Sequence, residues 1–180
     1  MFSFNMQTIK QSIEVISQIS ILEFTETEQI ISEIVQDNRI LHVFSCVLHK
    51  CNNVIRLSCL FLLSNVAVNS KADAEKLLMH PELISEILKC FAPKTALKVR
   101  VEASHVLLRL FSTLDKNQCA DVLGSEVFVE DLVQTISLWK TSSTSQENMD
   151  LLQNALLIIN RVLPSEDFDR RGGDSLLEDI

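Results

Sequence analysis

Glycine, proline and most aromatic residues are scarce in this chain of 180 residues. It contains three glycines, three prolines, one tryptophan and no tyrosine, whereas leucine, isoleucine and valine are abundant. An all-β domain needs many tight turns, and tight turns depend on glycine and proline at defined positions. The shortage of both residues excludes an all-β domain, so the composition predicts an all-α fold.

Clustered basic residues and long apolar runs are also missing. The net charge is -8 at pH 7, and the chain has no basic face that could neutralise a phosphate backbone, so we expect no direct nucleic-acid partner. No apolar run reaches about 18 residues, which predicts no membrane span. The first residues lack the basic region and apolar segment of a secretory signal, and we expect a soluble, intracellular protein.

The five cysteines do not indicate a disulfide framework, because their number is odd and Cys59 falls on the apolar face of a predicted helix. Reduced, buried thiols are typical of the cytosol and the nucleus, the compartments that we expect. Glycine-rich phosphate loops, nucleophile elbows and paired carboxylates are absent from the sequence. We therefore predict no enzyme, no cofactor and no small-molecule substrate.

Three residues that can bind metal, His42, Cys46 and His49, follow one another at helical spacing. A structural zinc site needs a fourth ligand, and Cys51 would point about 140° or more away from these side chains at 100° per residue. A solvated helix face with a partly buried cysteine explains the spacing better, so no metal site is predicted.

The chain does contain a long helical pattern at residues 54–68 that recurs three times. Around Asn65 the pattern has apolar Leu60, Leu63 and Val66, with the small Cys59 six residues before the asparagine. A small residue at a fixed helical position lets a neighbouring helix approach closely. The residues equivalent to Asn65 are Gln18, Arg109 and Arg161, at intervals of 47 (18 to 65), 44 (65 to 109) and 52 (109 to 161). The residues equivalent to Cys59 are Ser12, Ala103 and Ala155. Helical repeats of roughly 40 to 47 residues are typical of armadillo and HEAT solenoids.

A second apolar pattern supports the same repeat. It occurs as Leu83-Ile84-x-x-Ile87-Leu88, 45 residues later as Phe128-Val129-x-x-Leu132-Val133, and 43 residues earlier as Ile40-Leu41-x-x-Phe44. We therefore expect each repeat to contain a short, a medium and a long helix. The predicted single domain covers residues 1–180, with repeat frames of roughly 5–24, 25–68, 69–114 and 115–163 and a closing helix at 164–180.

Capping residues mark the expected helix boundaries. Thr25 with Glu28, before a short helix at 29–36, and Thr144 with Glu147, before a helix at 148–163, have the spacing of a capping box. Asp37 can cap the helix that follows it, and a proline at position 81 suits a first helical turn. The polar loop at 140–146 accounts for the longest interval between repeats.

The run from Cys59 to Ala67, small-x-aromatic-x-Leu-Ser-Asn-Val-Ala, resembles the third helix of armadillo repeats, most closely those of the importin-α family. The run from Gly172 to Glu178 is similar to the turn and second helix of a late importin-α repeat. The resemblance implies an all-α fold, an armadillo-type right-handed α-solenoid of about four three-helix repeats.

In the importin-α family each third helix presents a tryptophan and, four residues later, an asparagine, and the stacked pairs hold an extended basic nuclear-localisation peptide. The resemblance places the tryptophan sites at Glu14, Phe61, His105 and Leu157, and the asparagine sites at Gln18, Asn65, Arg109 and Arg161. One asparagine and no tryptophan match. Arg109 and Arg161 would repel a lysine-rich ligand.

The residues seven and four positions before each asparagine site lie within about 60° of it on a helix. If the long helices stack as in armadillo proteins, these residues form one concave surface, which solenoids use to bind long partners. We call this set the concave strip. Its members are Gln11, Glu14, Gln18, Ser58, Phe61, Asn65, Glu102, His105, Arg109, Asn154, Leu157 and Arg161.

Several strip residues have two interpretations. Phe61 and Leu157 either anchor a ligand or pack on an adjacent repeat. Asn65, like Gln18, would bond the main chain of a ligand, or is simply solvated. Arg109 and Arg161 either grip a carboxylate or phosphate of a ligand of mixed or acidic character, or pair within the chain with Glu102 or Glu14.

The sequence thus predicts an interaction scaffold or adaptor that binds an extended peptide or a helix of a partner protein along the concave strip. Three narrower roles remain open. The chain is an importin-α-like nuclear import adaptor, a chaperone co-factor that promotes nucleotide release, or a structural subunit of an obligate complex. In the last role a homo- or hetero-oligomer would form through the ends of the solenoid.

Overall fold

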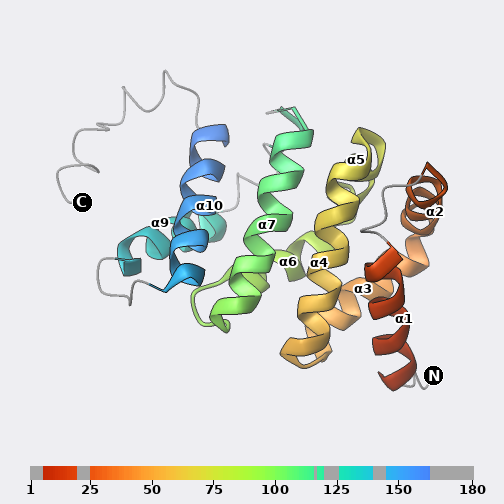
Figure 1. Cartoon of the computed structure of the whole chain (residues 1–180). Helices are drawn as coiled ribbons and strands as arrows, with labels where there is room; N and C mark the ends of the chain where they lie inside the picture. Colours follow the sequence, from red (N-terminus) through yellow and green to blue (C-terminus); the bar gives the residue numbers. More distant parts are fainter. Residues whose placement is uncertain (1–5, 20–24, 116, 120–125, 140–144, 163–180) are drawn as a thin grey trace.

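The computed structural model describes residues 6–19, 25–115, 117–119, 126–139 and 145–162. Within these ranges the chain is helical apart from short connections and contains no strand, so the predicted all-α class is confirmed. None of the described helices is long and apolar enough to cross a membrane. The helices are α1 (Met6–Ile19), α2 (Thr25–Gln36), α3 (Asn38–Lys50), α4 (Asn53–Asn69), α5 (Lys71–Leu78), α6 (Pro81–Phe91), α7 (Leu97–Thr113), α9 (Glu126–Trp139) and α10 (Gln146–Val162) (Figure 1).

The helices form two layers. The long helices α1, α4, α7 and α10 lie side by side in the front layer of Figure 1, and the medium helices α3, α6 and α9 lie behind them. Each long helix packs on the next one along the row, α1 on α4, α4 on α7 and α7 on α10. Successive repeats therefore stack in one direction, as the sequence predicts. The closing helix predicted at 164–180, and most of the short helix predicted after Asp115, lie outside the described residues.

Side-chain caps set several of the helix boundaries. Asp37 accepts a hydrogen bond from the backbone N–H of Arg39 and caps α3, as predicted. Asn52 caps α4, because its Oδ1 accepts from two backbone N–H groups of the first turn that have no partner inside the helix. Pro81 occupies the first turn of α6.

Two boundaries differ from the predicted ones. The helix α2 begins at Thr25 instead of residue 29, and the side chains of the predicted capping box at its start are outside the described residues. The helix α10 begins at Gln146, two residues before the predicted start, and Ser145 Oγ accepts a hydrogen bond from the backbone N–H of Asn148. A serine directly before the helix therefore caps it.

The small residues of the repeat lie where the layers meet. Cys59, Ala103 and Ala155 are completely buried, which agrees with the close helix approach that the sequence pattern indicates. The equivalent Ser12 is exposed, and it lies on the first of the described long helices. Around these positions leucine, isoleucine, valine and phenylalanine side chains from both layers form one continuous core.

Two buried charged residues tie neighbouring repeats together. Asp73 Oδ2 accepts hydrogen bonds from Ser32 Oγ at 2.7 Å, Asn69 Nδ2 at 2.6 Å and Ser70 Oγ at 2.7 Å, so it links α2 to the connection between α4 and α5. Arg100 of α7 donates hydrogen bonds to the carbonyl oxygen of Phe91 in α6 and to Thr135 Oγ1 in α9, so it links three helices. Sequence reasoning missed both residues, because the contacts that join the repeats, from Asp73 to Ser32 and from Arg100 to Thr135, are distant along the chain.

Candidate functional site

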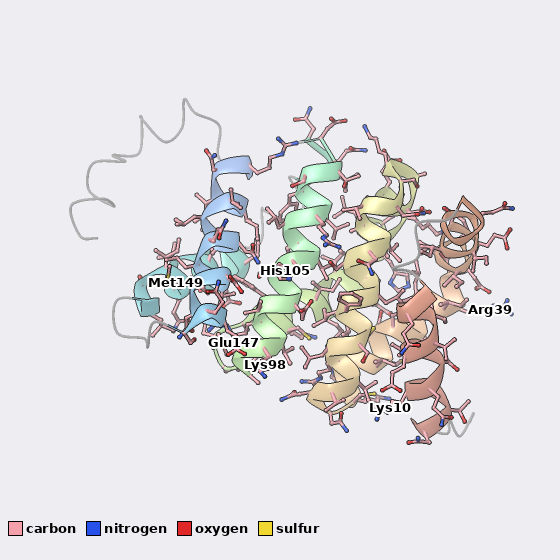
Figure 2. All side chains as sticks on the ribbon, viewed as in Figure 1. Lys10, Arg39, Lys98, His105, Glu147 and Met149 are labelled. Atoms are coloured by element: carbon pink, nitrogen blue, oxygen red, sulfur yellow. The ribbon has the colours of Figure 1, made fainter. Side chains whose placement is uncertain are left out.

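The twelve residues of the concave strip lie on the front layer, three on each of the long helices α1, α4, α7 and α10. Eleven of them are at least partly exposed, and only Asn154 is buried. Figure 2 shows the row of long helices that carries the strip, with His105 near the middle of α7. The row places polar and apolar strip residues of successive repeats next to one another.

Four strip residues, Ser58, Phe61, Glu102 and His105, line one open hollow of about 520 Å³ that is formed by α4, α7 and the start of α10. Phe61 remains 37% exposed there, although it is a large apolar side chain. An exposed aromatic side chain inside a hollow offers a ring face and an apolar surface to a ligand. The other residues that line the hollow are Leu57, Lys98, Val101, Glu147 and Asp150.

The hollow is acidic. Three carboxylates, from Glu102, Glu147 and Asp150, line it together with one lysine, which gives a formal charge of -2 when His105 is neutral. Lys98 Nζ lies 3.6 Å from Glu147 Oε1, and Figure 2 shows the two side chains together where α7 and α10 begin. The lysine therefore balances only one of the three carboxylates.

Three of the acidic and basic residues of the hollow were not predicted as site residues. Lys98 and Asp150 each lie 11 residues before an asparagine site, at 109 and 161, and 11 residues correspond to a rotation of only about 20° on a helix. Extending the frame by one further turn would have found them. Glu147 lies in the first turn of α10, and sequence reasoning placed it in a capping box.

Asn65 and Arg109 contact each other across the row. Arg109 Nη1 donates a hydrogen bond to Asn65 Oδ1 at 3.0 Å, and the two residues are 44 positions apart, one repeat. The side chain that was predicted to bond the main chain of a ligand is therefore engaged with the next repeat. The contact also directs part of the Arg109 guanidinium toward α4.

Arg161 reaches back one repeat in the same way. Its Nε donates to the carbonyl oxygen of Phe111 at 3.2 Å, and its Nη2 donates to that of Ser112 at 3.2 Å. Both strip arginines thus make contacts within the chain, which was one of the two interpretations, but the predicted partners were wrong. Glu14 instead contacts Lys10, and Glu102 contacts a histidine of its own helix.

Asn154 was predicted to lie on the open face of the concave strip, but it is buried. Its Nδ2 donates to Ser104 Oγ at 2.9 Å, and both side chains are buried between α7 and α10. The helical frame placed this residue on the open face, but the close approach of the two helices covers it. Asn154 therefore holds two repeats together and offers no surface to a partner.

The arrangement of the repeats matches a solved structure. A designed armadillo repeat protein in complex with the peptide (KR)4 superimposes with a TM-score of 0.64 at 17% sequence identity, and the match covers 88% of this chain. The fold is an armadillo-type α-solenoid. The chain spans 59% of the length of that designed protein. No protein-family model matches the sequence, and no curated protein matches it either.

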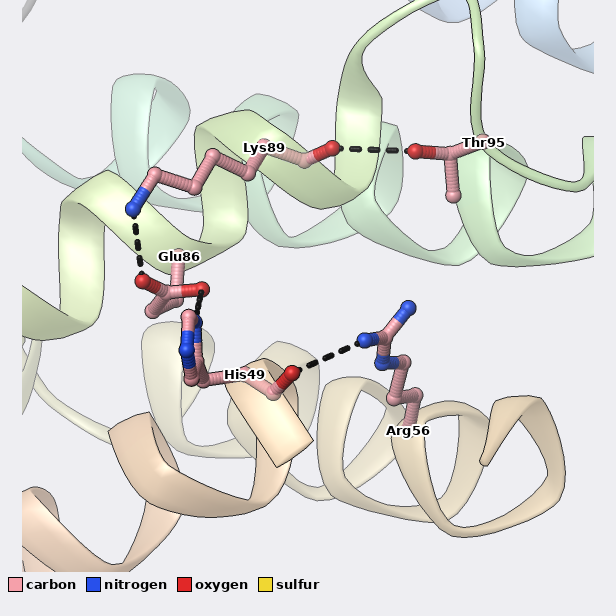
Figure 3. A network of polar contacts seen from close by, with 5 residues as sticks. All are labelled: His49, Arg56, Glu86, Lys89 and Thr95. Carbon is pink, nitrogen blue, oxygen red and sulfur yellow. Dashed lines mark hydrogen bonds and ion pairs between the residues drawn. The ribbon is translucent and has the colours of Figure 1, made fainter. Parts of the chain in front are cut away.

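The medium helices of adjacent armadillo repeats meet through histidine and glutamate side chains. His42 Nδ1 lies 3.0 Å from Glu82 Oε2, and His49 Nδ1 lies 3.3 Å from Glu86 Oε2. In Figure 3 the Glu86 carboxylate also accepts from Lys89, and the carbonyl oxygen of His49 accepts from Arg56. The two histidines of the candidate metal pattern therefore connect α3 to α6.

The third residue of that pattern is Cys46, whose Sγ lies 3.7 Å from His42 Nε2. Among the described residues, no group of three or more histidine, cysteine, aspartate and glutamate side chains is placed to hold a metal ion. All five cysteines are free, and four of them are buried. Burial raises the pKa of Cys59 far above its usual range and raises the pKa of Cys90 to about 11, so both remain uncharged thiols inside the armadillo core.

Proposed function

We propose that this chain is a protein-interaction scaffold that holds an extended peptide along the concave strip, with a lysine or arginine side chain of the peptide seated in the hollow beside Phe61. The observation that carries the proposal is the hollow itself, where an exposed aromatic ring is surrounded by carboxylates. A cation is attracted to the face of an aromatic ring, and each carboxylate adds a charge-assisted hydrogen bond.

The spacing of the long helices suits an extended chain. Packed helices lie about 8–10 Å apart, and an extended peptide advances about 3.3 Å per residue, so roughly three peptide residues span one repeat. A peptide crossing the row from α4 to α10 would therefore place about every third side chain over a new repeat. Leu157, which is partly exposed on α10, provides an apolar surface for a second side chain.

The designed armadillo protein supports this proposal, because the peptide in its complex, (KR)4, alternates lysine and arginine. The proposal differs from the expected ligand of mixed or acidic character. That expectation depended on free guanidinium groups at Arg109 and Arg161, and both groups are engaged with the preceding repeat. Their acceptors are neutral, so both keep their positive charge, but neither arginine lines the acidic hollow in which the cation of the peptide is placed. The five free cysteines favour the cytoplasm or the nucleus as the location.

Fluorescence anisotropy with a labelled (KR)4 peptide tests the proposal. Phe61→Ala removes the ring, and we expect it to weaken binding by about tenfold, as for a central anchor residue. The double variant Glu102→Gln, Asp150→Asn should weaken binding by a similar factor, because it removes two carboxylates without changing their shape. A labelled peptide of alternating aspartate and glutamate should not bind the native chain.

The matched control is Val68→Ala, which truncates an exposed apolar side chain of the same helix outside the hollow. Its affinity for the peptide should equal that of the native chain. Equal weakening by Val68→Ala and Phe61→Ala, or unchanged affinity after loss of the two carboxylates, would contradict the proposed site.

Affinity capture with the native chain and with Phe61→Ala then identifies the partner. A partner that depends on Phe61 and carries a basic segment would support the scaffold role. Its identity also decides between the import adaptor, the chaperone co-factor and the structural subunit. An identical set of captured proteins from both baits would assign binding to another surface.

A further inference from the structure

The medium helices of the back layer are not evenly packed. α3 packs on α6, and His42 and His49 of α3 contact Glu82 and Glu86 of α6. The backbones of α6 and α9 hardly approach each other, and α9 packs on α10 instead. An open hollow of about 970 Å³ lies between α6 and α9, nearly twice the volume of the hollow in the concave strip. We call it the back groove.

The back groove follows α6 along its length. Five of the residues that line it, Pro81, Ile84, Ser85, Leu88 and Ala92, belong to α6 or directly follow it, and they lie within about 100° of one another around the helix axis. A helix of 11 residues is about 16 Å long at 1.5 Å per residue. The groove therefore offers about three helical turns of surface to a second helix lying alongside.

The lining of the back groove is mainly apolar. Phe128 of α9 is buried at its base, where its ring packs edge-on against that of Phe91 with the ring centroids 5.9 Å apart. Met79, at the turn before α6, is 81% exposed, more than any other large apolar side chain in the described part of the chain. Methionine adapts its shape to a partner, and an amphipathic helix binds by laying its apolar face into a groove of this kind.

The back groove is basic, although the chain as a whole is acidic. Lys89, Lys94 and Asp131 line it, which gives a formal charge of +1, whereas the hollow in the concave strip has a formal charge of -2. Lys89 Nζ already lies 2.7 Å from Glu86 Oε1. Burial raises the pKa of Asp131, and Arg100 opposes that effect more than Lys94 does. Lys94 is exposed, so its charge is open to a carboxylate of a partner.

We propose that the back groove binds an amphipathic helix of a partner protein, with the apolar face of that helix on Ile84, Leu88 and Phe128 and an acidic side chain beside Lys94. The bound helix fills the space that direct helix contact fills between α3 and α6. Burial of the apolar lining supplies the attraction, and the lysine selects an acidic helix over a basic one. This inference is independent of the peptide-binding proposal, because the two hollows lie on different layers and have opposite charge.

A synthetic helical peptide tests the inference on the full chain. The probe has about 15 residues, enough for a marginally stable helix, with leucine along one face and glutamate on both sides of that face. In a methyl NMR titration we expect the signals of Met79, Ile84 and Leu88 to shift. A second peptide with glutamine in place of every glutamate should bind about threefold more weakly. The peptide (KR)4 should not displace the probe.

Two variants of exposed lining residues locate the probe. Ser85→Glu places a negative charge in the middle of the groove and should weaken binding by about tenfold or more. Lys94→Glu should weaken binding of the glutamate peptide by about fivefold but change that of the glutamine peptide little. The matched controls, Ser137→Glu and Lys50→Glu, alter exposed residues of α9 and α3 that do not line the groove. Both should bind the probe as the native chain does.

Three results would overturn the inference. The first is that the signals of Ile84 and Leu88 do not shift at the highest soluble concentration of the glutamate peptide. The second is that the control variants weaken binding as much as Ser85→Glu and Lys94→Glu do. The third is a dimer, detected by light scattering, that Ser85→Glu dissociates, because a second copy of the chain would then occupy the groove.

Discussion

Arg100 is the side chain on which three helices converge. It lies at the start of α7 and is almost completely buried, its Nε donates to the carbonyl oxygen of Phe91 in α6, and its Nη2 donates to Thr135 Oγ1 in α9 at 2.7 Å. Burial lowers the pKa of Arg100, and the carboxylate of Asp131 opposes that effect. The guanidinium is thus kept in the core by its hydrogen bonds.

We expect Arg100→Met to destabilise the protein by about 2–4 kcal/mol, because it leaves a buried carbonyl oxygen and a buried hydroxyl group without their donor. Urea unfolding followed by circular dichroism measures the change. Arg39→Met is the matched control, since Arg39 is exposed and its guanidinium pairs with the neighbouring Asp37. Equal loss of stability in both variants would contradict a special role for Arg100.

The pair of Asp37 and Arg39 gives a pH-dependent prediction. The side-chain hydrogen bonds from Arg39, and then the bond from its backbone N–H, lower the pKa of Asp37 from 3.8 to about 2. A lowered pKa in the folded state means that the pair stabilises the fold above pH 3.8 and that this contribution is lost as the pH falls through about 2.

A carboxyl NMR titration should therefore give Asp37 a pKa of about 2. In Arg39→Met the pKa should rise toward its ordinary value but stay below it, because the backbone N–H still donates. An ordinary pKa in the native chain would show that the exposed ion pair is not formed in solution.

At the scale of the helices, the start of α4 depends on the side chain of Asn52. Asn52 Oδ1 accepts from the backbone N–H groups of Val54 and Ile55. We expect Asn52→Ala to destabilise the protein by about 1 kcal/mol, the usual effect of removing an N-cap. Asn53→Ala is the control at the adjacent, exposed position, and thermal unfolding should show little change for it. A larger loss of stability from Asn53→Ala than from Asn52→Ala would contradict the assignment of the cap to Asn52.

Helices could be predicted from the sequence because their signals are local. The cap at Asp37, the proline at position 81 and the buried small residues Cys59, Ala103 and Ala155 each depend on a few neighbouring positions. The two apolar patterns recur at intervals of 43 to 52 residues, which was sufficient to predict the order of the stack.

The contacts between repeats were not predictable in the same way. A helical frame gives the direction of a side chain but not the distance to the next helix, so Asn154 was placed on the open face although it is buried. The partners of Arg109 and Arg161 are 44 to 50 residues away, and no local pattern identifies them. The hollow beside Phe61 was predicted only in part, because Lys98 and Asp150 lie one turn beyond the frame.

For the chain as a whole, the net charge of -8 has a consequence for binding. An acidic protein attracts a basic peptide, and salt screens this attraction. The Debye screening length falls from roughly 14 Å at 50 mM to roughly 4 Å at 500 mM ionic strength. We expect the affinity for (KR)4 to fall by about tenfold or more over this range. Anisotropy titrations at several salt concentrations measure it, and an affinity that does not depend on salt would contradict an electrostatic contribution.

The row of long helices has one further property. The last carbonyl groups of a helix have no partner inside it, and here the following repeat supplies one: Thr113 Oγ1 donates to the carbonyl oxygen of Ala67 near the end of α4, and Arg161 donates to those of Phe111 and Ser112 near the end of α7. The ends of α4 and α7 are thus completed by donors from the long helix that follows each of them. A cut between two repeats would leave the upstream fragment with a frayed final turn, so shortened versions of this chain should be designed with a replacement donor at the new terminus.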